Sequence, residues 1–204
     1  MRQRLKGSGN SGPALPCFGV PVVYDGGMRP ARRIFVAIPA SKSVQDAVYT
    51  WRKQYRNLPV RWIAPKNLHV TVIPPWEEED IEAVMDALRM AEGAAGPFTL
   101  DFTLVRYGPT LREPRLIWAE GEAPDQLFAA KHHIERALTR NPGTKPFRLH
   151  LTVARFDPAR FPKFSVQDMK DVISWTEEAR MFVLMESVLS PSGADYTVLG
   201  EFRL

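Results

Sequence analysis

The sequence predicts an α+β domain made of two related lobes. Segments with the character of β-strands outnumber helical segments, and helices interrupt the runs of strands. The pattern of expected strands and helices in the second half of the chain resembles that in the first half. A doubly wound parallel sheet would instead alternate strand and helix along the chain. We therefore expect two lobes with a cleft between them.

The expected strands are rich in β-branched and aromatic residues, and turn-forming residues separate them. In chain order they are Arg33–Ile38, Arg61–Ile63, Leu68–Ile73, Phe98–Tyr107, Arg115–Glu120, Phe147–Phe156, Arg180–Leu189 and Tyr196–Leu204. Several of these strands carry a continuous apolar run, which is typical of strands inside a core.

Three helices are expected where apolar residues recur at helical spacing. The first follows a capping Ser41 or Ser43 and runs to Tyr55. The second opens with the acidic run Glu77 to Asp80, which we interpret as a first turn that complements the helix dipole. The third extends from about Pro124 to Arg140. Together, the helices and strands describe most of the chain beyond residue 27.

The composition is that of a globular protein with a real core. The chain has 204 residues, 45% of them hydrophobic, and a net charge of +4 that suits a polyanionic partner without requiring one. The single cysteine, Cys17, excludes an internal disulfide and a cysteine-rich zinc site. No apolar run reaches the roughly 18 residues of a membrane helix. We expect a cytoplasmic monomer with no membrane partner.

Residues 1–27 differ from the rest of the chain. They are rich in glycine and proline and show no helical periodicity, which predicts a poorly ordered extension. They also lack the apolar region of a secretion signal and the amphipathic stripe of an import signal. One folded domain is expected from residue 28 to residue 204.

The most informative feature is a repeated pattern, His69-Val70-Thr71-Val72 and His150-Leu151-Thr152-Val153. Side chains alternate along a strand, so each segment presents one imidazole and one hydroxyl on the same face. Two imidazoles can exchange protons near neutral pH, and two hydroxyls can hold an anion between them. This set of groups fits acid-base cleavage of a phosphodiester.

The two motifs and their flanks resemble the RNA 2′,3′-cyclic phosphodiesterases, also called 2′-5′ RNA ligases, of the two-histidine phosphoesterase superfamily. The matching segments are Asn67–Val72, Phe147–Arg155, Ile34–Ile38 and Ser187–Phe202, within a match from about Met28 to Leu204. The resemblance implies two pseudo-symmetric antiparallel sheets with flanking helices and a central cleft. It also implies hydrolysis of a 2′,3′-cyclic phosphate at an RNA end to a 2′-phosphate, without a metal or another cofactor.

The resemblance also implies roles for single residues. His69 would be the general acid and His150 the general base, although the two motifs alone do not distinguish these roles. Thr71 and Thr152 would donate to the phosphate, and Arg155 would contact the phosphate or a base.

The alternation of side chains between the two faces of a strand adds a different expectation. Arg148 shares a strand face with His150 and Thr152 unless a bulge intervenes, whereas Arg155 falls out of register. The chain also departs from the family, because Pro74 stands where an aromatic residue often follows the first motif. Trp76, which we place in a loop, is a candidate replacement.

Other readings of the motifs remain open. A similar mechanism could act on a small cyclic nucleotide or a cyclic ADP-ribose phosphate, and a non-catalytic RNA-binding module could retain the basic cleft. Elsewhere, His132 and His133 lie off the apolar face of their helix and are expected to be exposed rather than to bind a metal. Four tryptophans lie in apolar patterns and are expected in the core, namely Trp51, Trp62, Trp118 and Trp175.

Overall fold

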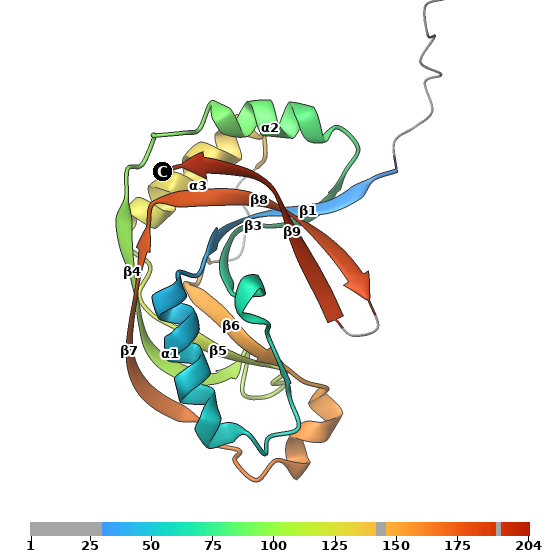
Figure 1. Ribbon diagram of the computed structural model, residues 1–204, viewed down its shortest axis with the longest axis vertical. Helices are drawn as coiled ribbons and strands as arrows, with labels where there is room; N and C mark the ends of the chain where they lie inside the picture. The colour runs from blue at the N-terminus through green and yellow to red at the C-terminus, as the bar shows by residue number, and fades with distance from the viewer. Residues whose placement is uncertain (1–29, 142–145, 191–192) are drawn as a thin grey trace, which may run out of the picture.

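The computed structural model describes residues 30–141, 146–190 and 193–204. The expected extension 1–27, the domain boundary at residue 28, and the turn residues Pro191 and Ser192 lie outside these ranges. Within them, two antiparallel sheets carry three helices (Figure 1). The predicted α+β class is confirmed.

The first sheet has the strand order β3-β1-β8-β9, and the second has the order β2-β6-β5-β4-β7. Every pairing within the two sheets is antiparallel. The strands are β1 (Arg32–Pro39), β2 (Arg61–Trp62), β3 (His69–Glu78), β4 (Phe98–Gly108), β5 (Leu116–Glu120), β6 (His150–Arg155), β7 (Lys170–Ala179), β8 (Met181–Ser190) and β9 (Gly193–Arg203).

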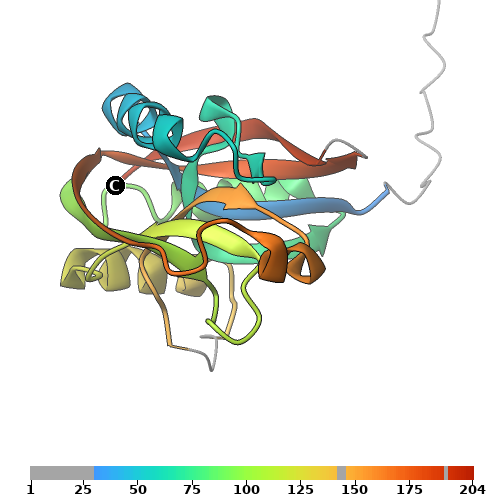
Figure 2. The ribbon, with the colours of Figure 1, turned by 90° about the horizontal axis from the view of Figure 1, so that it is seen from below.

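The helices cover opposite sides of the strands, as Figure 2 shows for the blue α1 and the olive α3. The expected cap is present, because the Ser41 side chain accepts a hydrogen bond from the backbone N–H of Val44 at the start of α1. The helices are α1 (Lys42–Arg52), α2 (Ile81–Arg89) and α3 (Asp125–Ala137), and the short 3₁₀ helices are η1 (Lys53–Tyr55), η2 (Pro65–Asn67) and η3 (Pro158–Lys163).

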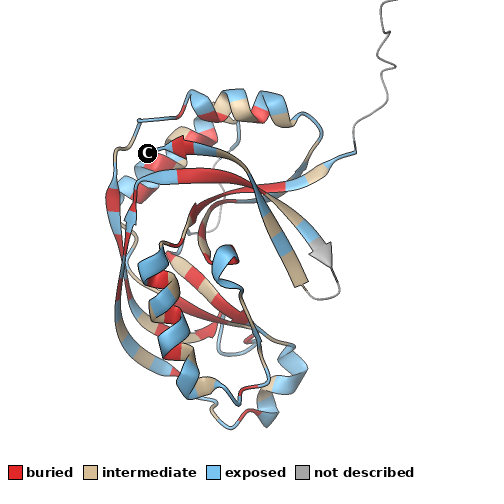
Figure 3. Ribbon diagram, viewed as in Figure 1, coloured by how far each residue is buried: buried red, intermediate tan, exposed pale blue. Residues whose placement is uncertain are grey.

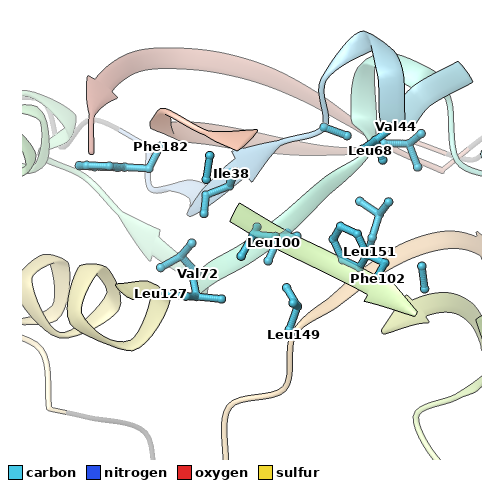
Figure 4. Close-up of a cluster of buried hydrophobic side chains, with 14 of the residues drawn as sticks. Ile38, Val44, Leu68, Val72, Leu100, Phe102, Leu127, Leu149, Leu151 and Phe182 are labelled. Atoms are coloured by element: carbon cyan, nitrogen blue, oxygen red, sulfur yellow. The ribbon is translucent and has the colours of Figure 1, made fainter. Parts of the chain in front are cut away.

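One continuous core joins both sheets and all three helices. Val72 of β3, Leu151 of β6 and Leu127 of α3 are among its fully buried members (Figures 3 and 4). The expected core tryptophans lie here or beside it: Trp51, Trp118 and Trp175 are buried and Trp62 is half-buried. Because each motif strand turns alternate residues into this core, its histidine and threonine are left on the opposite face.

The acidic run Glu77 to Asp80 does not form the first turn of a helix, which corrects the prediction. Glu77 and Glu78 belong to β3, and Asp80 is the N-cap of α2. Arg33 of β1 forms an ion pair with Glu77 across the strands, at 3.5 Å. β3 is an edge strand and can therefore accommodate the two prolines that precede Trp76. The expectation that Trp76 lies in a loop is also wrong.

Strand β7 was not predicted. Its inward positions are Trp175, Glu177 and Ala179, so the apolar alternation is interrupted by a carboxylate. Glu177 is buried because its Oε2 accepts the backbone N–H of Ser41 at 2.6 Å, at the start of α1. A tertiary contact therefore stabilises a charged residue at a position where the sequence pattern calls for an apolar one. Within the described residues, no helix is long and apolar enough to cross a membrane.

Candidate active site

The two motif strands have the same local structure. β3 begins at His69 and β6 begins at His150, and the first six residues of each strand follow an identical order of buried, half-buried and exposed positions. The histidine and the threonine of each motif are half-buried, namely His69, Thr71, His150 and Thr152. The residue between the histidine and the threonine is buried in both motifs. Each strand therefore presents an imidazole and a hydroxyl together, as the alternation predicted.

The imidazoles are held in the same way. Nδ1 of His69 lies 2.7 Å from the carbonyl oxygen of Asn67, and Nδ1 of His150 lies 2.9 Å from that of Arg148. A carbonyl oxygen only accepts, so both Nδ1 atoms carry the proton and donate it. Neither Nε2 has a hydrogen-bond partner among the described residues. Each ring therefore offers Nε2 for proton transfer.

Both strands also contain a bulge directly after the threonine. Ile117 and Trp118 are adjacent in β5 but pair with Ala154 and Thr152 of β6, which leaves Val153 as the extra residue. The extra residue shifts the alternation by one position, so Arg155 returns to the face of His150. The expectation that Arg155 falls out of register is wrong for this reason.

The matching bulge in β3 has a different consequence. Val36 and Ala37 of β1 pair with Ile73 and Thr71, so Val72 is the extra residue. The residue that corresponds to Arg155 is then Pro74, which is exposed. One strand thus ends its motif with a guanidinium, whereas the other ends it with a proline.

Aromatic rings surround His69. The ring centroid of Phe35 lies 5.0 Å from that of His69, and the Tyr196 ring stands edge-on at 5.2 Å. The pKa of His69 is lowered to about 4, chiefly by burial and also by the charges of Arg155 and His150, against the opposing hydrogen bond to Asn67. His69 is therefore neutral at pH 7 in the free protein.

His150 has a more polar setting. Its ring centroid lies 4.8 Å from that of Trp118, and the guanidinium of Arg148 lies 5.6 Å from the same indole. Burial lowers the pKa of His150, as do the charges of Arg148 and Arg155, whereas the hydrogen bond to the Arg148 carbonyl and the charge of Glu120 raise it. Glu120 in turn accepts a hydrogen bond from Arg106 at 2.6 Å.

The ends of the two strands meet in shared hollows. Thr71 of β3 lines a hollow of about 740 Å³ together with His150 and Arg148, whereas Arg155 of β6 lines one of about 120 Å³ together with Asn67. Thr71 of β3 thus lies beside the beginning of β6, and the end of β6 lies beside the beginning of β3. The charge of His150 also lowers the pKa of His69, and the charge of Arg155 lowers the pKa of both histidines, so the expected residues lie around one region between the strands.

Sequence reasoning did not identify the aromatic members of this region. Phe35 and Tyr196 come from β1 and β9, and neither is near a motif in sequence. Trp118 was expected in the core, yet it also contacts His150. Trp76 does not replace the missing aromatic residue directly, because its indole donates to Glu78 at 3.2 Å and packs under the guanidinium of Arg140 at 4.6 Å.

Carboxylates and thiols do not gather into a candidate metal cluster anywhere in the described part of the chain. His132 and His133 lie side by side on α3, exposed and half-buried respectively. The groups available at the site are imidazoles, hydroxyls and guanidiniums. These groups donate protons or hydrogen bonds to an anion.

Comparison with known proteins identifies the family. The model of the 2′-5′ RNA ligase superfamily matches residues 40–185. Relatives named RNA 2′,3′-cyclic phosphodiesterase include one from Thermus thermophilus, 31% identical over 84% of this chain and 90% of its own length. Another, from Archaeoglobus fulgidus, is 28% identical over 84% of this chain and 99% of its own length.

Solved structures agree with the sequence comparison. The Thermus thermophilus protein TT0787 has a TM-score of 0.67 at 26% identity and covers 84% of this chain and 97% of its own. Escherichia coli LigT complexed with phosphate, at 24% identity and a TM-score of 0.64, covers 86% of this chain and 98% of its own and shows the same fold. The predicted two-sheet fold and the resemblance seen in the motifs are confirmed. The chain belongs to the 2′-5′ RNA ligase superfamily.

Proposed function

We propose that the protein is an enzyme that hydrolyses the 2′,3′-cyclic phosphate at an RNA end to a 2′-phosphate, by acid-base catalysis with two histidines and without a metal. The main observation is the duplicated geometry of His69 and His150. Both rings donate Nδ1–H to a backbone carbonyl and leave Nε2 available, on two strands that belong to different sheets and contact each other. The names of the relatives support the choice of substrate.

The reaction needs one base and one acid. His150 Nε2 removes a proton from water, the water oxygen attacks phosphorus, and the bond from phosphorus to the ribose O3′ breaks. His69 Nε2–H then donates a proton to the departing O3′, which gives a 3′-hydroxyl and a 2′-phosphate. The assignment of acid and base follows the family resemblance, because both rings are held alike.

Negative charge grows on the non-bridging phosphate oxygens during this step. The hydroxyls of Thr71 and Thr152 donate hydrogen bonds to these oxygens, and the guanidinium of Arg155 adds a charge-assisted contact. Arg148 lies beside His150 and is the second candidate for that contact. The bulge in β6 is what brings Arg155 to the face of the histidine.

The lowered pKa values suit this division of roles. A neutral imidazole is the form that acts as a base, and both histidines are neutral near pH 7 in the free protein. An anionic phosphate placed between the strands favours the charged imidazolium and supplies the protonated acid. If the 5′-hydroxyl of a second RNA end takes the place of water, the same groups would open the cyclic phosphate to a 2′-5′ linkage with O3′ as the leaving oxygen, so 2′-5′ ligation of RNA ends is part of the proposal.

The proposal is tested by turnover of an RNA oligonucleotide that ends in a 2′,3′-cyclic phosphate, in excess chelator. The product should resist a phosphatase that removes only 3′-phosphates. The variant His132→Ala is a matched control, because it removes an exposed histidine outside the site. Loss of activity in chelator would contradict the metal-free mechanism, and a product that the phosphatase clears would show that O2′ is the leaving oxygen.

Comparing rates on the oligonucleotide, a nucleoside 2′,3′-cyclic phosphate and a cyclic ADP-ribose phosphate identifies the substrate class. A higher kcat/KM on either small molecule would favour the cyclic nucleotide alternative. Binding of RNA without any turnover would favour a binding module.

A further inference from the structure

A hollow of about 730 Å³ lies beyond the end of β6, and four arginines line it. They come from four separate segments: Arg61 from β2, Arg115 just before β5, Arg155 from β6 and Arg160 from η3. All four side chains are exposed. Figure 1 shows η3 as an orange turn at the periphery of the second sheet, and Figure 3 shows the same turn as exposed.

The sheet itself concentrates this charge. Arg61 and Arg155 are direct cross-strand partners in the β2–β6 pair, and Arg155 also pairs with Leu116, the neighbour of Arg115. Like charges placed directly opposite each other destabilise a sheet. None of the four forms an ion pair with a carboxylate in residues 30–141, 146–190 or 193–204. Asp157, the acidic residue on the described wall, accepts the backbone N–H of Ala159 at 3.0 Å.

The hollow shares two of its arginines with the candidate active site. Arg61 and Arg155 also line the smaller hollow that contains Asn67 and Tyr196, and these two residues contact His69. The charge of Arg155 lowers the pKa of both histidines, so its guanidinium acts on the reaction centre and on the hollow. A chain that leaves the site past Arg155 reaches Arg115 and Arg160 next.

The hollow beside His150 has a different character. Its cations already have partners, since Lys131 is paired with the buried Glu135 and Arg140 lies over the ring of Trp76. Arg148, the third cation of this wall, lies over the ring of Trp118 at 5.6 Å. Apolar side chains such as Phe147 complete its wall. This wall suits a base or a ribose better than a series of phosphates.

We propose that the four-arginine hollow binds the backbone phosphates of the RNA strand that leads to the cyclic phosphate. The assignment of the reacting end rests on the proposed function. Guanidiniums bind phosphate oxygens in a bidentate manner, and these four do not first have to leave a carboxylate partner in the described residues. The enzyme would therefore prefer an RNA chain over a mononucleotide, through binding rather than through the chemical step.

The test uses the double variant Arg115→Gln/Arg160→Gln, which leaves the candidate active-site residues intact. Its matched control is Arg136→Gln/Arg203→Gln, which removes two exposed charges elsewhere on the surface. On a short RNA ending in a 2′,3′-cyclic phosphate, the double variant should lose about tenfold in kcat/KM through KM, with kcat unchanged. On a nucleoside 2′,3′-cyclic phosphate it should match the wild-type protein.

Salt dependence provides a second readout that does not require turnover. Fluorescence anisotropy should be used to measure binding of a labelled RNA that ends in a 2′-phosphate. Each phosphate contact contributes about 0.7 to the slope of log Kd against log salt for a single strand, so the double variant should lose roughly 1.4. The control pair should retain the wild-type slope and affinity.

Equal RNA affinity and salt slope in the double variant and the wild-type protein would overturn the inference. It would also be overturned if Arg140→Gln weakened RNA binding and the double variant did not, because the strand would then leave over the hollow beside His150. Failure of the wild-type protein to hydrolyse any cyclic phosphate would count against the proposed function alone, and the binding measurements would still decide the role of the arginines.

Discussion

The two motif strands are alike in backbone and unlike in surroundings. β3 and β6 share the His-Thr alternation, the Nδ1 hydrogen bond and the bulge after the threonine. His69, however, lies between the rings of Phe35 and Tyr196, whereas His150 faces Trp118 and the charge of Arg148. The comparison teaches that the strand duplicates the position of the imidazole, while its neighbours make the two copies different.

The largest expected effect tests whether both copies are needed. His69→Ala and His150→Ala should each lower kcat by about 10² to 10⁴, the usual scale for a general acid or base. Steady-state kinetics on a cyclic-phosphate-ended RNA measures this, with His132→Ala as the control. Near-normal hydrolysis by one variant and none by the other would show that a single base is sufficient.

The difference in burial should appear as a pH dependence of stability. The pKa of His69 is about 4 in the folded protein and near 6.5 when unfolded, so its contribution to stability is present above pH 6.5 and is lost as pH falls towards 4. This loss amounts to about 3 kcal/mol in the free energy of unfolding. Urea unfolding across this pH range measures it.

The variant His69→Asn isolates that contribution, since an asparagine amide can still donate to the carbonyl of Asn67 but does not titrate. Its stability should fall less between pH 6.5 and 4 than that of the wild-type protein. His132→Asn should keep the full wild-type dependence. An unchanged pH dependence in His69→Asn would mean that this ring is not the source of the effect.

Removing either threonine hydroxyl should lower kcat less than removing a histidine, and by a similar factor for the two threonines. Thr71→Val and Thr152→Val remove one donor each with little change in volume, and kcat should fall by about tenfold to 10³-fold, less than or similar to the effect of losing a histidine. Single-turnover rates at saturating protein measure this step directly. If Thr71→Val were harmless and Thr152→Val severe, phosphate contacts would come from β6 alone.

The smallest expected effect on catalysis concerns the position where β3 and β6 differ, which is Pro74 in β3 and Arg155 in β6. Arg155→Gln should raise KM by about tenfold, and it should raise the pKa of both histidines because it removes a positive charge that now lowers them. NMR titration of the imidazole protons gives both pKa values, and Arg155→Lys should restore them in part. The control is Pro74→Ala at the corresponding place in β3, where both pKa values should stay unchanged.

Much of the fold could be read from the sequence because its signals are local. The strand that became β1, the cap of α1 and the apolar face of α3 follow from residue type and spacing over a few positions. The acidic run before α2 was misassigned, because strand pairing of Glu77 and Glu78 with β1 overrides local helix signals. The strand β7 was missed because Glu177 occupies an inward position that only the start of α1 makes favourable.

By itself the sequence determined which groups share a face, since a period of two places His69 with Thr71 and His150 with Thr152 wherever the strands lie. Only the tertiary structure decided which side Arg155 faces, because the bulge that turns it depends on hydrogen bonds to β5. Strand order likewise brought Tyr196 to His69 and Arg61 to Arg155. These contacts join residues far apart in the chain, and register between strands, rather than local preference, sets them.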